Sequence, residues 1–441
     1  FYQYDWEKVE IDPTGSYWST NDCAGKGGQK VMLGFGDSPD FGNLPAELTF
    51  LGVPRGADDK PSDDGQYGLA IRVFAPGLNN TEFGFYYMNY HSRLPTINAQ
   101  TGTLDGALAA GNVAANVAPA VVTSYLGTNP GDVAAAIGAG VGAGGTLAQS
   151  AVITDGLIEG GGDPTSAEFT GAVTASATDA YANTARYIIE YPEDIQLFGV
   201  SFNTAFDSIG ASLQGEYSYR KDAPLQIDDV ELLLAALSPL ANPATNLLAD
   251  NQVGVFGLNT YIPGYIEKDV SQVQMTMTKL FGPTLGADQF VMVGEVGLTH
   301  IHGMPSKSKL RLEAPGTYVT GNPNQANDPR GAHYLKPAES SDVFADQDSW
   351  GYRIVAKMDF NNAIGAVTLS PRIAWAHDVD GNTPGPGGNF IEDRRAITFG
   401  LGASYLSAWS ADLSYTDFFG ASRYNLVNDR DFVAFNIKYS F

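Results

Sequence analysis

The most regular pattern along this chain is an alternation of apolar and polar side chains, and residues 431–441 show it most clearly. The apolar positions of this segment are Val433, Phe435, Ile437, Tyr439 and Phe441. Because successive side chains of a strand point to opposite faces, these five share one face and the polar residues between them share the other. The pattern predicts a terminal strand with one apolar face.

Similar alternation recurs toward the start of the chain. Counting the terminal one, the predicted strands are 1–10, 67–75, 82–91, 193–205, 208–219, 269–281, 288–300, 349–360, 365–378, 394–406, 409–418 and 431–441. The connections between them alternate without exception between short and long, and the long ones are 11–66, 92–192, 220–268, 301–348, 379–393 and 419–430. Outer-membrane barrels place tight turns on the periplasmic side and long loops outside, whereas soluble sandwiches have no reason to do so.

Charged residues occur opposite the apolar set within these strands. They are Arg72, Glu216, Glu295, Arg353, Lys357, Arg372, Asp412 and Lys438. A charge on the lipid face costs roughly 2–4 kcal/mol near the midplane, so these side chains are expected to face a polar lumen. The prediction is an all-β protein, an antiparallel transmembrane β-barrel formed by residues 1–441 as one unit. The alternative is a soluble protein of two packed sheets, which explains the alternation but not the asymmetry of the loops.

Composition narrows the classes of function. The net charge of −24 and the pI of about 4.4 argue against nucleic-acid binding, because a phosphate backbone would be repelled. Mean hydropathy is −0.12, and no run of Leu, Ile, Val and Phe is long enough to predict a spanning helix. The 22 Tyr, 23 Phe and 5 Trp fit aromatic girdles at two membrane surfaces. Cys23 is the single cysteine, so no internal disulfide is expected.

Four segments carry a family resemblance: Phe1-Tyr-Gln-Tyr-Asp-Trp-Glu, residues 31–37, residues 187–202 and residues 365–372. They resemble the domain-of-unknown-function family numbered 1302, outer-membrane proteins of Proteobacteria, and more distantly the long-chain fatty-acid channels. The resemblance implies an outer-membrane location among lipid and lipopolysaccharide. It also implies a further N-terminal part, which would bring twelve strands to about sixteen; a self-contained barrel of twelve or fourteen is the alternative. Family members are thought to act with an inner-membrane pump and a periplasmic carrier, which implies traffic of a hydrophobic or lipid-like molecule.

Two long loops carry helical signals. In 92–192, the segments 104–126 and 133–157 are rich in Ala, Gly and Val, and in 220–268 acidic residues precede a leucine-rich stretch from Ile227. One interpretation is a cap that stabilises the barrel mouth. Another is an apolar capture site lined by Leu232, Leu233, Leu234 and Leu237. A third is that 133–154 spans the membrane.

Candidates for metal binding and catalysis are fewer. Asp378, Asp380 and Asn382, followed by Glu392 and Asp393, place oxygen atoms at a spacing like that of a Ca²⁺ loop; a solvated acidic loop is the alternative. His300 and His302 share one face of a strand end, although two imidazoles alone do not make a site. No Ser, His and acid grouping is brought together by the predicted strands, so no enzyme is expected.

The leading functional hypothesis is a transport barrel for a hydrophobic molecule, with apolar outer loops that bind the ligand. A general diffusion porin for small polar solutes is the main alternative, because the predicted lumen is charged. A barrel that serves only to display its loops is a third class.

Overall fold

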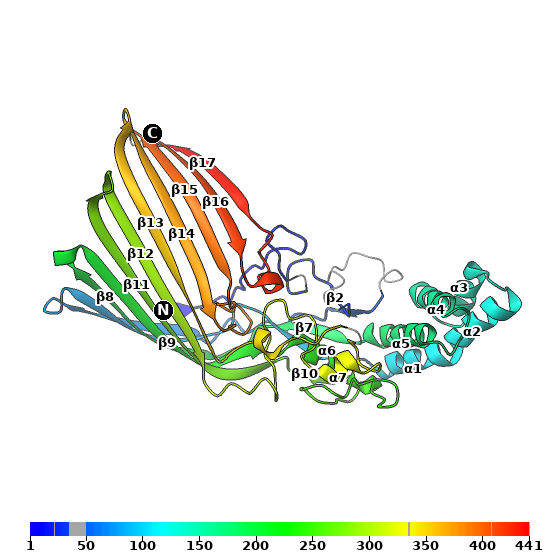
Figure 1. The fold of residues 1–441 in the computed structure, drawn as a ribbon. Coiled ribbons are helices and arrows are strands. Elements are labelled where there is room, and N and C mark those ends of the chain that lie inside the picture. Colours follow the sequence, from blue (N-terminus) through cyan, green and yellow to red (C-terminus); the bar gives the residue numbers. More distant parts are fainter. Residues whose placement is uncertain (22, 35–49, 334–335, 407, 441) are drawn as a thin grey trace.

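A computed structural model describes residues 1–21, 23–34, 50–333, 336–406 and 408–440. Its centre is one strongly curved, 12-stranded antiparallel sheet in the order β1-β4-β5-β8-β9-β11-β12-β13-β14-β15-β16-β17 (Figure 1). Phe441, Ser407 and residues 35–37 of the second resemblance segment lie outside the described residues.

Each of the twelve predicted segments overlaps one strand of this sheet, so the twelve predicted strands are confirmed, although two of them extend into the predicted loop 220–268. The strands are β1 (Tyr2–Gln3), β4 (Gln66–Ala75), β5 (Thr81–Tyr90), β8 (Ile195–Phe206), β9 (Ala211–Gln226), β11 (Tyr265–Thr284), β12 (Ala287–Ile301), β13 (Asp348–Ile364), β14 (Val367–Asp380), β15 (Arg395–Tyr405), β16 (Trp409–Phe419) and β17 (Phe432–Tyr439).

The first strand, β1, is much shorter than the predicted 1–10. Trp6 donates its backbone N–H to Asp63 (2.9 Å) and its indole N–H to the Ser92 carbonyl (3.1 Å). These bonds draw the chain away from the sheet edge.

The short and long connections lie at opposite ends of the sheet, as predicted. Tight turns join β4 to β5, β8 to β9, β11 to β12, and β13 to β14, and they lie along the left-hand rim of the sheet in Figure 1, from the blue hairpin below to the orange one at the top. The opposite end carries all the long loops, so this end is called the outer end below.

One face of the sheet is apolar and exposed. A row of paired residues crosses seven strands on this face: Ile71, Phe85, Val200, Tyr217, Val273, Leu298 and Trp350. Ile71 is 52% exposed and Val273 is 40% exposed, which excludes burial of this row against a second layer of the described chain. Lys279 shares this face near the tight turns, where its ammonium donates a hydrogen bond to the Ile209 carbonyl and lies 5.6 Å from the centre of the Phe281 ring.

The long loops build a folded cap at the outer end. The cap contains β6 (Thr96–Gln100), β7 (Arg186–Glu190) and β10 (Tyr261–Ile262), which pair in the order β10-β6-β7, with the helices α6 (Asp229–Leu237) and α7 (Pro323–Asn327) and the hairpin of β2 (Lys30–Met32) with β3 (Gly52–Pro54). Single 3-10 turns lie at 207–209, 238–240, 341–343 and 422–424. The hydrophobic core of the cap is formed around Tyr181, Ile189 and Leu234, each fully buried. Hydrophobic burial of this kind stabilises the cap as a folded unit.

A helical arm projects from the cap (Figure 1). Its helices are α1 (Leu104–Asn112), α2 (Ala118–Val122), α3 (Val133–Gly142), α4 (Leu147–Glu159) and α5 (Ala167–Ala182), with π-helical turns at 113–117 and 123–128. The segment 104–128 is long and apolar enough, by length and composition, to cross a membrane, and it is the one such helix in the described chain. The sequence pattern did not predict a spanning helix here, because much of the hydrophobicity of this segment comes from alanine and not from Leu, Ile, Val or Phe. The interpretation of 133–154 as a single span is wrong, because Thr146 caps a new helix there.

The N-terminal segment links the two edges of the sheet at the outer end. β1 and β17 are the edge strands and do not pair with each other. Tyr17 donates its hydroxyl hydrogen to the Asp431 carbonyl (3.1 Å), and the Trp18 ring packs edge-on against Phe432, with centroids 5.6 Å apart. Arg430 donates a hydrogen bond to the Ser19 carbonyl (3.2 Å). The outer rim is therefore continuous although the sheet itself is open.

Candidate functional site

The outer end encloses a cavity of about 710 Å³, called the mouth cavity below. Five segments form its wall. They are the N-terminal segment, residues 94–97 at the start of β6, the helix α6, residues 313–318 and residues 383–388. Apolar side chains that line it include Val31, Met32, Leu94, Leu233 and Leu426. A concave site of this size with mainly apolar walls is of the kind that binds small molecules.

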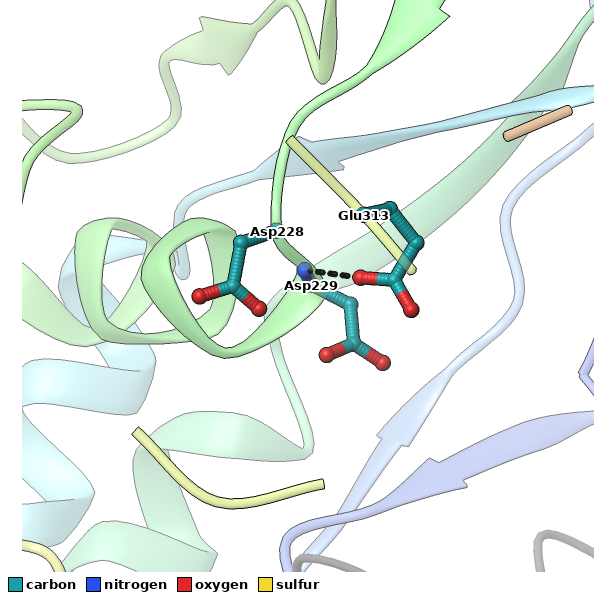
Figure 2. A group of neighbouring side chains, drawn as sticks. All are labelled: Asp228, Asp229 and Glu313. Carbon is teal, nitrogen blue, oxygen red and sulfur yellow. Dashed lines mark hydrogen bonds between the residues drawn. The ribbon is translucent and has the colours of Figure 1, made fainter. Parts of the chain in front are cut away.

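Three carboxyl groups gather where α6 meets the mouth cavity: Asp228, Asp229 and Glu313 (Figure 2). One carboxylate oxygen from each lies within 4.8 Å of the others. Asp228 begins the helix by accepting a hydrogen bond from the Val230 N–H (3.3 Å), and Glu313 accepts one from the Asp229 N–H (2.9 Å). Helix N-termini favour such acceptors because their first N–H groups have no partner within the helix. Asp229 and Glu313 line the cavity, whereas Asp228 is fully buried behind them.

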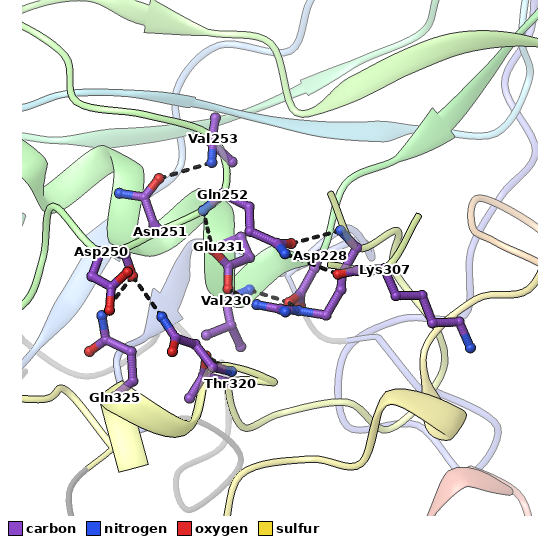
Figure 3. A network of polar contacts seen from close by, with 12 residues as sticks. Asp228, Val230, Glu231, Asp250, Asn251, Gln252, Val253, Lys307, Thr320 and Gln325 are labelled. Carbon is purple, nitrogen blue, oxygen red and sulfur yellow. Dashed lines mark hydrogen bonds and ion pairs between the residues drawn. The ribbon is translucent and has the colours of Figure 1, made fainter. Parts of the chain in front are cut away.

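Arg311 supplies the positive charge behind this cluster. Its guanidinium forms an ion pair with Glu231 and lies 3.6 Å from Asp228, and both carboxylates are inaccessible to solvent. Gln252 ties the same region together: its backbone N–H donates to Glu231 (2.5 Å), and its side-chain oxygen accepts from the Arg311 N–H (2.8 Å) (Figure 3). One arginine thus serves two buried acids of the helix.

Burial raises the pKa values of two of these carboxyl groups. For Asp228 the largest cause is loss of solvent, followed by the negative charges of Asp229 and Glu231, and Arg311 opposes the shift; the pKa lies well above its ordinary value. The pKa of Glu313 is likewise raised well above its ordinary value, first by burial and then by Asp229 and Asp228. Protons are therefore retained in this cluster at pH values where solvated carboxyl groups have lost them.

A pH dependence of cap stability follows from these shifts. On unfolding, the pKa values of Asp228 and Glu313 return to roughly 4, so the folded cap holds more protons than the unfolded chain above that pH. Its free energy of unfolding is therefore expected to fall as the pH rises above roughly 4, toward the raised pKa values of the two buried carboxyl groups. The measurement is the denaturant midpoint of the cap at each pH. Glu313→Gln should flatten the dependence, and a wild-type midpoint that rises with pH would contradict the expectation.

A second, smaller hollow of about 230 Å³ lies on the polar face of the sheet. It brings together three residues predicted for the lumen, Glu216, Glu295 and Arg353, with Gln274 and Phe390. Glu295 and Arg353 are directly paired across β12 and β13, and Glu295 accepts a hydrogen bond from Thr276 (3.0 Å). This strand hollow is polar, in contrast to the mouth cavity.

The loop 381–394 contributes residues to the walls of both spaces. Residues 383 and 385–388 line the mouth cavity, while Phe390 lines the strand hollow and is only 8% exposed. Two glycines of the sheet make room for its ring, because a Cβ added to Gly297 or Gly351 would meet the ring at 3.2 or 3.0 Å. Thr383 and Phe390 hold the loop closed through a backbone bond of 2.9 Å. Phe390 is thus wedged against the inner face of the sheet.

The remaining predicted lumen residues also lie on the polar face but are not part of the hollow. Arg372 forms a two-pronged ion pair with Asp412, of which one contact is 2.8 Å. Lys357 pairs with Asp359 (2.9 Å), and Arg72 lies 3.9 Å from Glu82. Lys438 pairs in register with Ser410, close to the tight-turn end. Arg72 and Glu82 join the neighbouring strands β4 and β5, and Arg372 and Asp412 join β14 to β16 across β15, whereas Lys357 and Asp359 lie on the same strand.

The proposed capture site on α6 needs correction. Leu232, Leu234 and Leu237 are at most 3% exposed and form part of the hydrophobic core of the cap. Of the four predicted leucines, Leu233 alone lines the mouth cavity. A leucine-rich helix was correctly predicted here, but three of its four leucines stabilise the cap, which is the interpretation given first above.

The structure does not assemble the predicted Ca²⁺ ligands. Asp378 is 1% exposed and is neutralised by Arg353 (3.2 Å) and Arg394 (2.6 Å), so its carboxylate is already paired. It also accepts a hydrogen bond from the Ile391 N–H (3.2 Å), which anchors the loop 381–394. Asp380 is exposed at the end of β14, and the Asn382 side chain accepts from the Glu392 N–H (3.0 Å). Within the described chain, Asp378, Asp380 and Asn382 do not converge on one point.

The two histidines each have another partner. His300 pairs with Asp348 (2.7 Å), and His302 shares a hydrogen bond with the Ser271 hydroxyl (2.8 Å), although the two rings are only 4.6 Å apart. The carboxyl cluster at α6 was not predicted, because Glu313 comes from a distant segment. The acidic residues before α6 were the only available signal.

Comparison with known proteins gives one family. A family profile described as "Protein of unknown function (DUF1302)" matches residues 1–441. No curated protein shows a significant match.

Proposed function

The chain belongs to the DUF1302 family of proteins of unknown function, and from that premise we propose that it is an outer-membrane protein that transports a hydrophobic or lipid-like molecule. The observation that carries the proposal is the mouth cavity. A mainly apolar chamber at the outer end suits the binding of a hydrophobic molecule, whereas a pore for polar solutes does not require one. The loop 381–394 lines both this chamber and the polar strand hollow, and the proposed route of transport runs between these two spaces.

The exposed apolar face supports a membrane location. Soluble monomers rarely expose a continuous apolar patch beyond a few hundred Å², and here such a face extends across the whole sheet. Acyl chains would cover it without leaving backbone groups unpaired, except at the edges of β1 and β17, which need partners in lipid. Closure of the sheet into a barrel stays a prediction.

Leu233→Gln tests whether the mouth cavity binds apolar molecules. An amide in this wall is expected to weaken binding of a neutral hydrophobic dye by about tenfold, because the added polar group must be desolvated when the ligand covers it. Binding is measured by dye fluorescence with the protein in lipid nanodiscs. Leu258→Gln is the control, because Leu258 is 37% exposed in a loop outside the cavity. Equal dye affinity in the two variants and the wild type would count against the cavity. A point change is used because removal of α6 would take away the core of the cap.

A general diffusion porin remains the alternative, favoured by the polar strand hollow and its Glu295 and Arg353 pair. The two functions differ in planar bilayers. A transporter closed by the loop 381–394 should show little steady ion conductance, whereas a porin conducts continuously.

The partners follow from the same proposal. A molecule that crosses the outer membrane must be received or supplied at the end with the tight turns, where a periplasmic carrier and an inner-membrane pump would act. Lipid and lipopolysaccharide would contact the apolar face and the outer rim.

A further inference from the structure

We propose that Ser271 and His302 form a nucleophile and a base that cleave carboxylic esters, with lipid esters as the class of substrate. This activity goes beyond transport, and only the choice of a lipid ester rests on the membrane location proposed above. Ser271 lies on β11 and His302 in the turn that follows β12, 31 positions apart in the chain. The pairing of these two strands brings together a serine and a histidine that the sequence pattern did not connect.

The geometry of the pair is that of a nucleophile beside its base. The Ser271 hydroxyl shares a hydrogen bond with His302 Nε2 (2.8 Å). An imidazole at this distance can take the hydroxyl proton while the oxygen attacks a carbonyl carbon. Ser271 is 8% exposed, whereas His302 is exposed at the surface. The pair therefore lies just beneath the surface and is open on the side of the histidine.

Several contacts fix the His302 ring in place. Its backbone N–H donates to the Asp269 carbonyl (2.9 Å), and its ring lies edge-on against Tyr219 and His300, with centroids 5.8 and 4.6 Å apart. The Asp269 carboxylate accepts a hydrogen bond from the Tyr219 hydroxyl (2.5 Å) and also interacts electrostatically with His302. A negative charge at this place favours the imidazolium that forms when the serine proton is taken.

Tyr217 supplies a hydrogen-bond donor for the transition state. Its hydroxyl, on the neighbouring strand β9, lies 3.0 Å from Ser271 Oγ. When an ester approaches Oγ, this hydroxyl can turn from Oγ to the carbonyl oxygen, where negative charge develops as the carbon becomes tetrahedral. Removal of one such donor lowers the rate by roughly 10²–10³ in enzymes that use it.

The reaction is an acyl transfer to water in two steps. Ser271 Oγ attacks the carbonyl carbon, its proton passes to His302 Nε2, and the bond from that carbon to the alcohol oxygen breaks as His302 gives the proton to the alcohol. Water then attacks the acyl–serine ester, again with His302 as the base, and the carboxylic acid and the Ser271 hydroxyl are released. Ester and water give acid and alcohol, so no further reactant is needed.

The position of the pair on the sheet indicates the class of substrate. Ser271 is two residues from Val273 on the same face of β11 and pairs in register with His300, so it lies at the outer margin of the apolar face. Directly inward on this face are Val273 and Leu298, which are 40% and 41% exposed. Acyl chains would cover these side chains, and aromatic rings such as those around His302 gather where hydrocarbon meets the polar head groups. The ester groups of lipids lie at that level.

The test is ester hydrolysis by the full chain in detergent micelles. The probes are p-nitrophenyl decanoate, whose acyl chain enters the micelle, and p-nitrophenyl acetate. Ser271→Ala and His302→Gln are expected to lower kcat/KM for the decanoate by at least about 100-fold, and Tyr217→Phe by at least about tenfold. The wild type should prefer the decanoate to the acetate by at least about tenfold, because the longer chain is held by apolar contacts.

A covalent label separates catalysis from a structural role of the same hydrogen bond. An alkyl fluorophosphonate forms a bond from Ser271 Oγ to phosphorus and releases fluoride, while the proton passes to His302. Mass spectrometry of the digested protein should find the label on Ser271 of the wild type. His302→Gln should be labelled at least about 100-fold more slowly, although glutamine still accepts the hydrogen bond of the serine.

Two substitutions are matched controls. Ser201→Ala removes a hydroxyl that shares a hydrogen bond with the Tyr86 hydroxyl (3.3 Å), and His377→Gln removes an imidazole that lies edge-on against Tyr352, with centroids 5.6 Å apart. Both should keep hydrolysis within about twofold of the wild type, because neither touches the pair. Dye binding in the mouth cavity should be unchanged in all these variants, which shows that the protein is folded.

The outcomes keep this inference separate from the proposed transport. Absence of hydrolysis by the wild type, or hydrolysis that persists in Ser271→Ala, would overturn the inference and leave binding in the mouth cavity as it stands. Equal rates with the decanoate and the acetate would overturn lipid esters as the substrate. Normal dye binding by Leu233→Gln would count against the transport proposal alone.

Discussion

Arg311→Ala is expected to lower the unfolding free energy of the cap by about 3–5 kcal/mol, the range seen when one partner of a buried ion pair is removed. The guanidinium is 8% exposed, and the carboxylates of Asp228 and Glu231 that face it are 0% exposed. Without Arg311 both acids remain in the core of the cap with no counter-ion. They must then take up protons or draw water into the core, and either event destabilises the fold.

The measurement is limited proteolysis of the outer loops across a denaturant series, since the sheet can remain folded while the cap opens. Arg330→Ala is the control: Arg330 pairs with Asp328, but the side chain is 43% exposed, and such pairs contribute about 0–1 kcal/mol. Adding Asp228→Asn and Glu231→Gln to Arg311→Ala should restore much of the lost stability, because the uncompensated charges are gone. Loss no greater than that of the control would show that Arg311 is not needed to neutralise the cluster.

Under the proposed membrane location, Ile373→Arg is expected to destabilise the sheet by about 2–4 kcal/mol, the cost of an arginine on the lipid face near the bilayer midplane. Ile373 lies in the middle of β14 on the apolar face and is 39% exposed. The guanidinium would there be placed among acyl chains with no polar partner. The stability is measured by reversible urea unfolding in lipid vesicles.

Ala374→Arg is a closely matched control, because the next residue of the same strand has nearly the same depth but faces the polar side. It pairs in register with Val355 and Thr398, so its new side chain would enter the lumen. If both variants lose the same stability, or if neither does, the apolar face is not in contact with lipid.

The sheet could be predicted from the sequence because its signal is local. Alternation at every second position fixes which residues share a face, as in the row through Ile71 and Val273, and the lengths of the connections fix the end at which each loop lies. The helical signals of 104–126 and 227–237 are local in the same way. α5 was missed because Thr, Ser and Gly are frequent in it, and these residues are weak helix formers.

The site could not be predicted, because it depends on contacts distant in sequence. Glu313 reaches the start of α6 from 84 residues away, through a bridge that pairs Ile227 with Leu312. The run of leucines in α6 also does not reveal which side chains face the core of the cap and which face the cavity. The adjacent residues Leu233 and Leu234 show this, because Leu233 lines the mouth cavity whereas Leu234 is fully buried in the core. Asp378 shows the same limit, since its spacing resembles a Ca²⁺ loop but two arginines occupy it.

The ring of Phe390, seated over Gly297 and Gly351, has a kinetic consequence for the proposed transport. On the proposed route, cargo that moves from the mouth cavity to the strand hollow would have to displace this ring together with the loop that Asp378 anchors. The rate-limiting step would then be a conformational excursion of one short segment, with its own activation barrier. The transport rate would depend on how often this loop moves away from the sheet, and not on the size of the space beside the loop when it is closed.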